Sequence, residues 1–114
     1  MLGSDWAFAE GRVGGTGNCQ TYLLLGNPNA TDATAVVTYV RAAGLPAVQQ
    51  TYTVKAGSRL TVWTNAVQGL ADETFGITVA ATGATIAAER AMYWDAAGVQ
   101  WAAGTATAGV QIIR

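Results

Sequence analysis

The chain has 114 residues, of which 51% are hydrophobic and only 11% are charged, and its net charge is −1 at pH 7. A chain of this length buries roughly 65% of its extended surface on folding, which is enough for one core. The scattered Lys and Arg residues exclude a basic surface for nucleic acid. No apolar run is long enough to cross a membrane, so no membrane insertion is expected. Residues 1–114 are therefore expected to form a single domain.

The first third of the chain predicts two strands. β-Branched and aromatic residues recur in short segments that Gly, Asn and Pro interrupt, as in all-β domains. Residues 4–10 alternate, which places Trp6, Phe8 and Glu10 on one face of a strand. A loop with four glycines covers residues 11–18, and the continuous apolar run 19–26 predicts a strand that is either central or buried on both sides.

The middle of the chain predicts a hairpin and a further strand. Residues 33–42 and 48–55 are the paired strands, with a turn at 44–46. The strand 59–64 follows, and its alternation places Arg59 and Trp63 on one face. Residues 65–72 fit either one helical turn or a loop.

Residues 73–81 and 85–94 predict two more strands, a glycine-rich stretch covers 95–104, and 107–113 closes the chain as a last strand. About eight short strands with short connections are typical of an all-β, two-sheet antiparallel β-sandwich, either immunoglobulin-like or jelly-roll-like. A small closed barrel is the alternative.

Most enzyme chemistry is excluded by composition. The chain has no histidine and one cysteine, Cys19, so it lacks histidine triads, thiolate metal sites and redox pairs. The seven acidic residues leave a carboxylate-pair hydrolase as the remaining enzyme type, but the chain is short for a substrate cleft. The sequence therefore predicts a protein that is not an enzyme and that uses no cofactor and no metal.

Aromatic and charged residues near the two ends of the chain predict a structural clasp. A charge among apolar neighbours should be paired, so Glu10 is expected to pair with Arg90 and to join the first strand to the penultimate one. The alternative interpretation is a binding site with aromatic platforms. The residues of this predicted clasp are Trp6, Phe8, Glu10, Arg90, Met92 and Trp94.

A second group of residues is a candidate binding surface or interface. Trp63 shares a face with Arg59 and is the Trp with the strongest expectation of exposure, which suits sugar stacking or a protein interface. The competing explanation is that this face packs against a neighbouring loop or domain. Tyr52 and Trp101 complete the candidates.

Motifs along the chain resemble a known family. They are Trp6-Ala-Phe-Ala-Glu-Gly11, Thr21-Tyr-Leu-Leu-Leu-Gly-Asn-Pro-Asn29, Thr51-Tyr-Thr-Val54, Gly69-Leu-Ala-Asp72 and Glu89-Arg-Ala-Met-Tyr-Trp94. Together they look like a repeated β-sandwich domain of large bacterial secreted and cell-surface proteins, a family of unknown function. The resemblance covers nearly the whole chain in the same order.

This resemblance implies an extracellular spacer or adhesion domain and supplies no catalytic residues. Two positions depart from the family pattern. Ala106 stands where a polar residue, often His, is expected, and Trp63 replaces a smaller or polar residue. Residues 1–4 show no signal-peptide pattern, so the signal of an exported protein would lie outside this chain.

The leading hypothesis is a non-catalytic structural or interaction domain of a bacterial surface or secreted protein, such as a spacer, stalk or adhesion domain. Its expected partners are neighbouring domains or copies of itself. One alternative is a self-assembling subunit that pairs through strand edges, with 107–113 as the donor strand. The other is a carbohydrate-binding module that uses Trp63, Tyr52 or Trp101.

Overall fold

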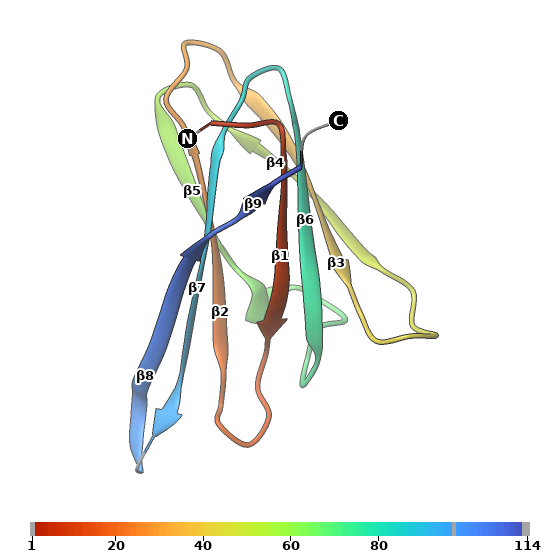
Figure 1. Cartoon of the computed structure of the whole chain (residues 1–114), viewed down its shortest axis with the longest axis vertical. Helices are drawn as coiled ribbons and strands as arrows, with labels where there is room; N and C mark the ends of the chain where they lie inside the picture. Colours follow the sequence, from red (N-terminus) through yellow and green to blue (C-terminus); the bar gives the residue numbers. More distant parts are fainter. Residues whose placement is uncertain (1, 97, 113–114) are drawn as a thin grey trace.

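A computed structural model describes residues 2–96 and 98–112 and contains strands and one short 3-10 helix, η1 (Figure 1). The elements are β1 (Asp5–Arg12), β2 (Gln20–Asn27), β3 (Ala33–Val40), β4 (Val48–Val54), β5 (Ser58–Trp63), η1 (Thr64–Ala66), β6 (Thr74–Thr82), β7 (Ala87–Ala96), β8 (Val99–Ala108) and β9 (Val110–Gln111). The expectation of an all-β chain is confirmed.

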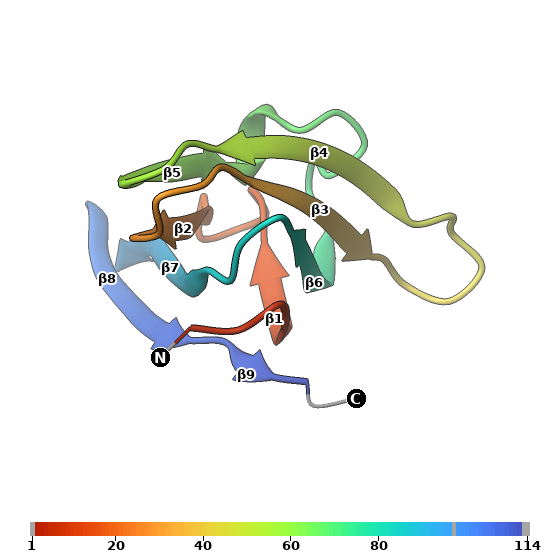
Figure 2. The same ribbon diagram turned by 90° about the horizontal axis from the view of Figure 1, so that it is seen from above.

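Two antiparallel sheets pack face to face, which confirms the predicted β-sandwich (Figure 2). One sheet has the order β4-β3-β6-β1-β9 and the other has the order β5-β2-β7-β8. The strand β2 lies between β5 and β7, so the prediction of a central strand is confirmed as well. Residues 65–72 were predicted as a helical turn or a loop, and the 3-10 turn η1 covers only the first part of this region.

The C-terminal part of the chain differs from the sequence expectation. No strand was predicted in the glycine-rich stretch 95–104, but β8 begins there at Val99 and pairs with β7. The predicted last strand is divided between the two sheets: its first residues end β8, and β9 pairs with β1. Gly109 lies at the crossing, where a side chain would meet the Phe8 ring at 2.9 Å. The last residue of the predicted strand, Ile113, lies outside the described residues.

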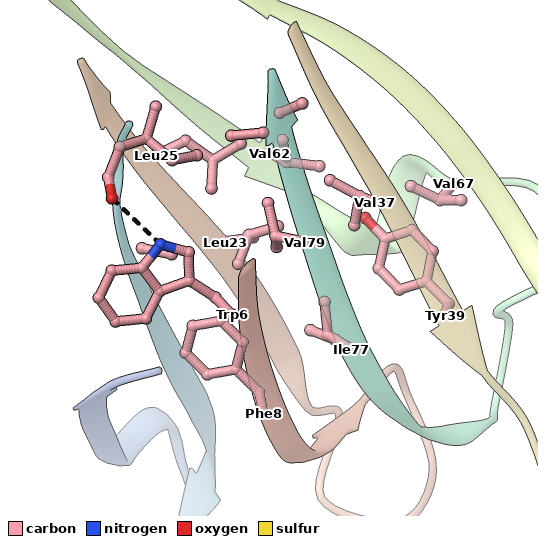
Figure 3. Close-up of a cluster of buried hydrophobic side chains, with 14 of the residues drawn as sticks. Trp6, Phe8, Leu23, Leu25, Val37, Tyr39, Val62, Val67, Ile77 and Val79 are labelled. Carbon is pink, nitrogen blue, oxygen red and sulfur yellow. Dashed lines mark hydrogen bonds between the residues drawn. The ribbon is translucent and has the colours of Figure 1, made fainter. Parts of the chain in front are cut away.

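The core forms where alternate residues of both sheets point inward (Figure 3). Leu23 and Leu25 of β2 face Val37, Ile77 and Val79 of the opposite sheet, and all five are essentially inaccessible to solvent. Burial of this kind stabilises the fold by about 25 cal/mol for each Å² of apolar surface removed from water.

Tyr52, predicted as a possible binding residue, belongs to this core rather than to the candidate surface. It pairs with the fully buried Ala35 and packs against the core beside Tyr39. The Tyr39 hydroxyl is buried close to the Tyr52 hydroxyl but makes no hydrogen bond of ordinary geometry with the described residues. Burial, with Tyr52 adding to it, raises the pKa of Tyr39 well above its usual value.

Replacing Tyr39 with Phe is expected to raise the free energy of unfolding by about 1 kcal/mol, because it removes a buried hydroxyl without a partner. Because the pKa of Tyr39 is raised in the fold, the wild type loses further stability as the pH rises above about 10, where tyrosine ionises in the unfolded chain. Phenylalanine cannot ionise, so the advantage of Tyr39→Phe is expected to grow at high pH. Urea unfolding at pH 7 and pH 11 measures both effects, with Tyr93→Phe, at an exposed position, as the matched control. A loss of stability at pH 7 in Tyr39→Phe would contradict this account.

Candidate functional site: an aromatic sheet face

The outer face of the sheet β5-β2-β7-β8 carries a cluster of exposed apolar side chains. Three large rings project from it: Trp63 is 48% exposed, Tyr93 is 43% exposed and Trp101 is 45% exposed. The half-buried Tyr22 and Leu24 of β2 lie between them. We call these five residues the aromatic face. Apolar residues gathered in one patch mark interaction sites more often than single exposed ones do.

Cross-strand pairing holds the aromatic face together. Tyr22 of β2 is the Cα partner of Trp63 on β5. Its ring meets the ring of Tyr93 on β7 edge to face, with centroids 6.0 Å apart and planes at 72°. The indole Nε1 of Trp63 donates a hydrogen bond of 2.8 Å to Oε1 of Gln20. The rings are therefore held in defined orientations by their neighbours, which lowers the entropy lost when a partner binds.

Trp101 reaches this face through an irregularity in β8. The pairing of β7 with β8 shifts between Trp94 and Ala96, opposite the segment that carries Trp101. Trp101 itself has φ 52°, in the left-handed region that bulky residues rarely adopt. Its backbone N–H donates a hydrogen bond of 2.9 Å to Oδ1 of Asp95 across the hairpin. Strained residues of this kind are concentrated at functional sites.

Replacing Asp95 with Ala is expected to destabilise the end of the β7–β8 hairpin by about 1 kcal/mol, because Trp101 loses the acceptor that holds its backbone. Asp95→Asn keeps an acceptor oxygen and is the matched control. Amide hydrogen exchange of residues 93–103 measures the change. Equal exchange in the Ala variant and the wild type would show that Asp95 does not hold this turn.

The aromatic face is hollowed at its centre. A depression of about 380 Å³ is lined by Tyr22, Leu24, Tyr93 and Trp101 together with smaller neighbours. Gly104 allows the Tyr93 ring to lie across β8, because a side chain there would meet the ring at 2.8 Å. The aromatic face therefore contains a shallow groove with aromatic walls.

Charged side chains lie at the two ends of this face. Arg59 of β5 and Glu89 of β7 are exposed at one end and flank β2 on opposite sides. Asp95 lies at the other end, where its Oδ1 accepts from the backbone of Trp101. The outward residues of β2, β5 and β7 between these ends are uncharged. A partner for this surface therefore needs an apolar or ring-stacking side and little charge.

The structure brings three of the four residues of the predicted binding surface onto one sheet face. Arg59, Trp63 and Trp101 lie there and are exposed, whereas Tyr52 does not. Sequence reasoning missed Tyr22, Leu24 and Tyr93. Their signal was present, since alternate residues of a strand covered on one side must face outward.

The predicted clasp forms, but through a different contact. Arg90 is only 8% exposed, and its Nη1 donates a hydrogen bond of 2.6 Å to the main-chain oxygen of Glu10, not to the carboxylate. A register shift in β1 between Phe8 and Gly11 turns Glu10 outward and places Gly11 opposite Phe75. The predicted common face of Trp6, Phe8 and Glu10 therefore ends at the bulge.

The other clasp residues lie where the sequence indicates. Trp6, Phe8 and Met92 are buried, and Trp94 is half-buried. Met92 and Trp94 line a hollow of about 310 Å³ beside Cys19, under the loop between β1 and β2. Cys19 is buried, and this burial raises the pKa of its thiol. It therefore acts as a small apolar side chain.

Replacing Glu10 with Gln is expected to change the free energy of unfolding by less than about 0.5 kcal/mol, because the carboxylate does not make the contact. Replacing Arg90 with Ala is expected to cost roughly 1–3 kcal/mol, since the Glu10 carbonyl loses its donor. Urea unfolding of the two variants measures the difference. Equal losses of stability in both variants would support the ion pair between Glu10 and Arg90 that the sequence predicted.

Within residues 2–96 and 98–112, no group of three or more His, Cys, Asp and Glu side chains is arranged to hold a metal ion. No helix in the same part of the chain has the length and apolarity needed to cross a membrane.

Comparison with known proteins finds structures of similar fold but identifies no family. No family model matches the sequence, and no curated protein matches it significantly. The crystal structure of Thermotoga maritima 1070 is similar with a TM-score of 0.83 and 11% identity, over 96% of this chain and 95% of that chain. The Anabaena sensory rhodopsin transducer is similar with a TM-score of 0.64 and 21% identity, over 77% of this chain and 94% of that chain. At these identities the likeness concerns the fold.

Proposed function

We propose that the chain is a non-catalytic interaction domain that binds its partners through the aromatic face. The observation that carries the proposal is the gathering of Trp63, Tyr93 and Trp101 on one sheet face, each exposed by more than 40%. Trp and Tyr contribute most of the binding energy in many protein interfaces, because a large ring loses little conformational freedom on burial. A face that held only the fold together would keep these rings covered.

The strained position of Trp101 supports the same proposal. Its left-handed backbone and its hydrogen bond to Asp95 add nothing to the core, since the indole is 45% exposed. A local conformational cost is retained where it serves binding. Recognition by this face needs no catalytic group, which agrees with a chain that has no histidine.

The setting we propose is a bacterial surface or secreted protein, in which the domain acts as a spacer, stalk or adhesion domain. The sequence motifs that resemble such repeated domains support this setting. Only 11% of the residues are charged, which is low for a domain that stays separate from others in solution. One protein of similar fold is named a sensory rhodopsin transducer, which offers a precedent for a role in interaction.

Site-specific photo-crosslinking in the cells that produce the protein tests this proposal. A photoreactive phenylalanine analogue replaces Trp63 in one variant and Thr51, an exposed residue of β4 on the other sheet, in the control. We expect defined crosslinked products from position 63 and none of them from position 51. Equal crosslinking at positions 63 and 51, or none either at position 63 or at the neighbouring exposed position Thr61 of the same face, would overturn the proposal.

Carbohydrate is the second candidate ligand, and the groove of about 380 Å³ between Tyr22, Tyr93 and Trp101 favours it. Sugar rings stack on exposed aromatic rings of this kind. A glycan array probed with the wild type and with Trp101→Ala tests this candidate, with Trp94→Phe as the control. Binding that Trp101→Ala abolishes would support a glycan ligand, and an array without binding would remove it.

A further inference from the structure

We infer that β8 is a self-pairing edge, through which two copies of the chain join antiparallel into one continuous sheet. This inference rests on the proposed interaction function and names a second copy as the partner. Among the described elements, β7 is the only substantial neighbour of β8, which ends its sheet. An edge strand presents free backbone N–H and C=O groups that another strand can pair with.

The edge of β8 lacks the features that protect edge strands from pairing. Val99–Ala108 contains neither a charged residue nor proline. The edge strand β5 contains Arg59, the edge strand β4 lies between Pro46 and Lys55, and β9 has two residues. Charges, prolines and short length are the usual means of blocking an edge. In β8 the bulge near Trp101 blocks only the first part and leaves 103–108 regular.

The segment 104–108 is also left uncovered by the rest of the described chain. The side chains of Thr105, Ala106 and Thr107 are all exposed, although successive residues of a strand point to opposite faces. Neither face of this segment is therefore covered. Its residues are Ala, Gly and Thr, whose small side chains let another strand approach closely.

The sequence of β8 is self-complementary about Ala106. A two-fold axis at this residue places Ala106 opposite Ala106 of the second copy. It also places Thr105 of each copy opposite Thr107 of the other, which gives two Thr–Thr pairs. Cross-strand Thr–Thr pairs of this kind are favourable. Gly104 then lies opposite Ala108, so every pair in the register is small and uncharged. The net charge of −1 adds almost no repulsion between the copies.

This pairing would extend the aromatic face. A two-fold axis perpendicular to the sheet keeps the outer faces of both copies on the same side. The order then becomes β5-β2-β7-β8 followed by the same strands of the second copy in reverse. Trp101 and Tyr93 of each copy would lie near the junction, since both flank β8. One continuous surface with two sets of rings results.

Sedimentation equilibrium of the whole chain over a wide concentration range tests the inference. We expect a species of twice the 11.7 kDa chain mass. Replacing Thr105 and Thr107 with Lys places like charges opposite each other across the junction. This double variant is expected to be a monomer only. Thr51→Lys with Thr53→Lys, on exposed positions of the edge strand β4, is the matched control and should still dimerise.

Disulfide trapping tests the register. Ala106→Cys, in a Cys19→Ala background, is expected to form a covalent dimer on mild oxidation, because the Cα atoms of directly opposed residues lie about 4.5–5.5 Å apart, within the range that a disulfide spans. Thr51→Cys in the same background should not. A chain that stays monomeric at millimolar concentration, or a dimer that survives the two Lys substitutions in β8, would overturn the inference. Crosslinking at position 63 reports on the proposed function separately, because Trp63 lies on β5, away from β8.

Discussion

Replacing Trp6 with Ala is expected to lower the free energy of unfolding by about 3–5 kcal/mol. Trp6 is 3% exposed, and its indole Nε1 donates hydrogen bonds to the main-chain oxygens of Ile86, at 3.0 Å, and of Gly3, at 3.3 Å. The ring thus joins β1 to the start of β7, across the two sheets (Figure 3). Since a domain is stable by only about 5–15 kcal/mol, this loss would remove a large part of the total.

A milder variant and a matched control make this measurement decisive. Trp6→Phe keeps a ring in place but loses the donor to Ile86, so a cost of roughly 1–2 kcal/mol is expected. Trp63→Ala removes the same residue type from the exposed face and should change stability by less than about 0.5 kcal/mol. Urea unfolding followed by circular dichroism measures all three. Equal losses for Trp6→Ala and Trp63→Ala would contradict the assignment of core and surface.

Replacing Asn27 with Asp is expected to destabilise the protein by roughly 2–4 kcal/mol at pH 7. Asn27 is 1% exposed, and its Nδ2 donates hydrogen bonds of 2.9 Å to the main-chain oxygens of Thr31 and Val54. Its Oδ1 accepts from the backbone N–H and the side chain of Asn29. A carboxylate at this position would keep the acceptor but face two carbonyl oxygens that have lost their donor.

The sign of the pH dependence follows from that geometry. Burial beside two carbonyl oxygens raises the pKa of the new carboxyl in the folded state above its unfolded value near 3.9. The loss is therefore largest at neutral pH and shrinks as the pH falls toward about 4, because the protonated acid can donate again. Thermal unfolding of Asn27→Asp and wild type at pH 7 and pH 4 measures it. Asn18→Asp, at an exposed position, is the control, and a difference that grows on acidification would refute the assignment.

The sheets and the core were predictable from alternation, whereas local irregularities were not. Val37 and Tyr39 face inward because they are the apolar partners in a two-residue period, which the sequence displays directly. The bulge in β1 leaves no comparable signal. One extra residue between Phe8 and Gly11 reverses the orientation of Glu10. The predicted ion pair failed for that reason, although the two strands are joined at the predicted residues.

The aromatic face was only half predictable for a related reason. Trp63 stood out because Arg59 and Thr61 share its side of the strand, whereas Tyr22 is hidden in a continuous apolar run. Trp101 lies in a glycine-rich stretch in which no strand was predicted. Its strand exists because β7 offers an edge for pairing, which is a property of the tertiary structure. Asn27 shows the same limit: its turn was predictable, but its buried contacts with β4 were not.

Hydroxyl-radical footprinting of the tryptophans tests the central claim most directly, which is that the aromatic face is covered when the protein functions. The oxidation of each ring is compared between the isolated chain at low concentration and the protein in the cells that produce it. We expect Trp63 and Trp101 to be oxidised in the isolated chain and protected in the cells, with the buried Trp6 unreactive in both. Equal oxidation of Trp63 and Trp101 in the two samples would contradict the account.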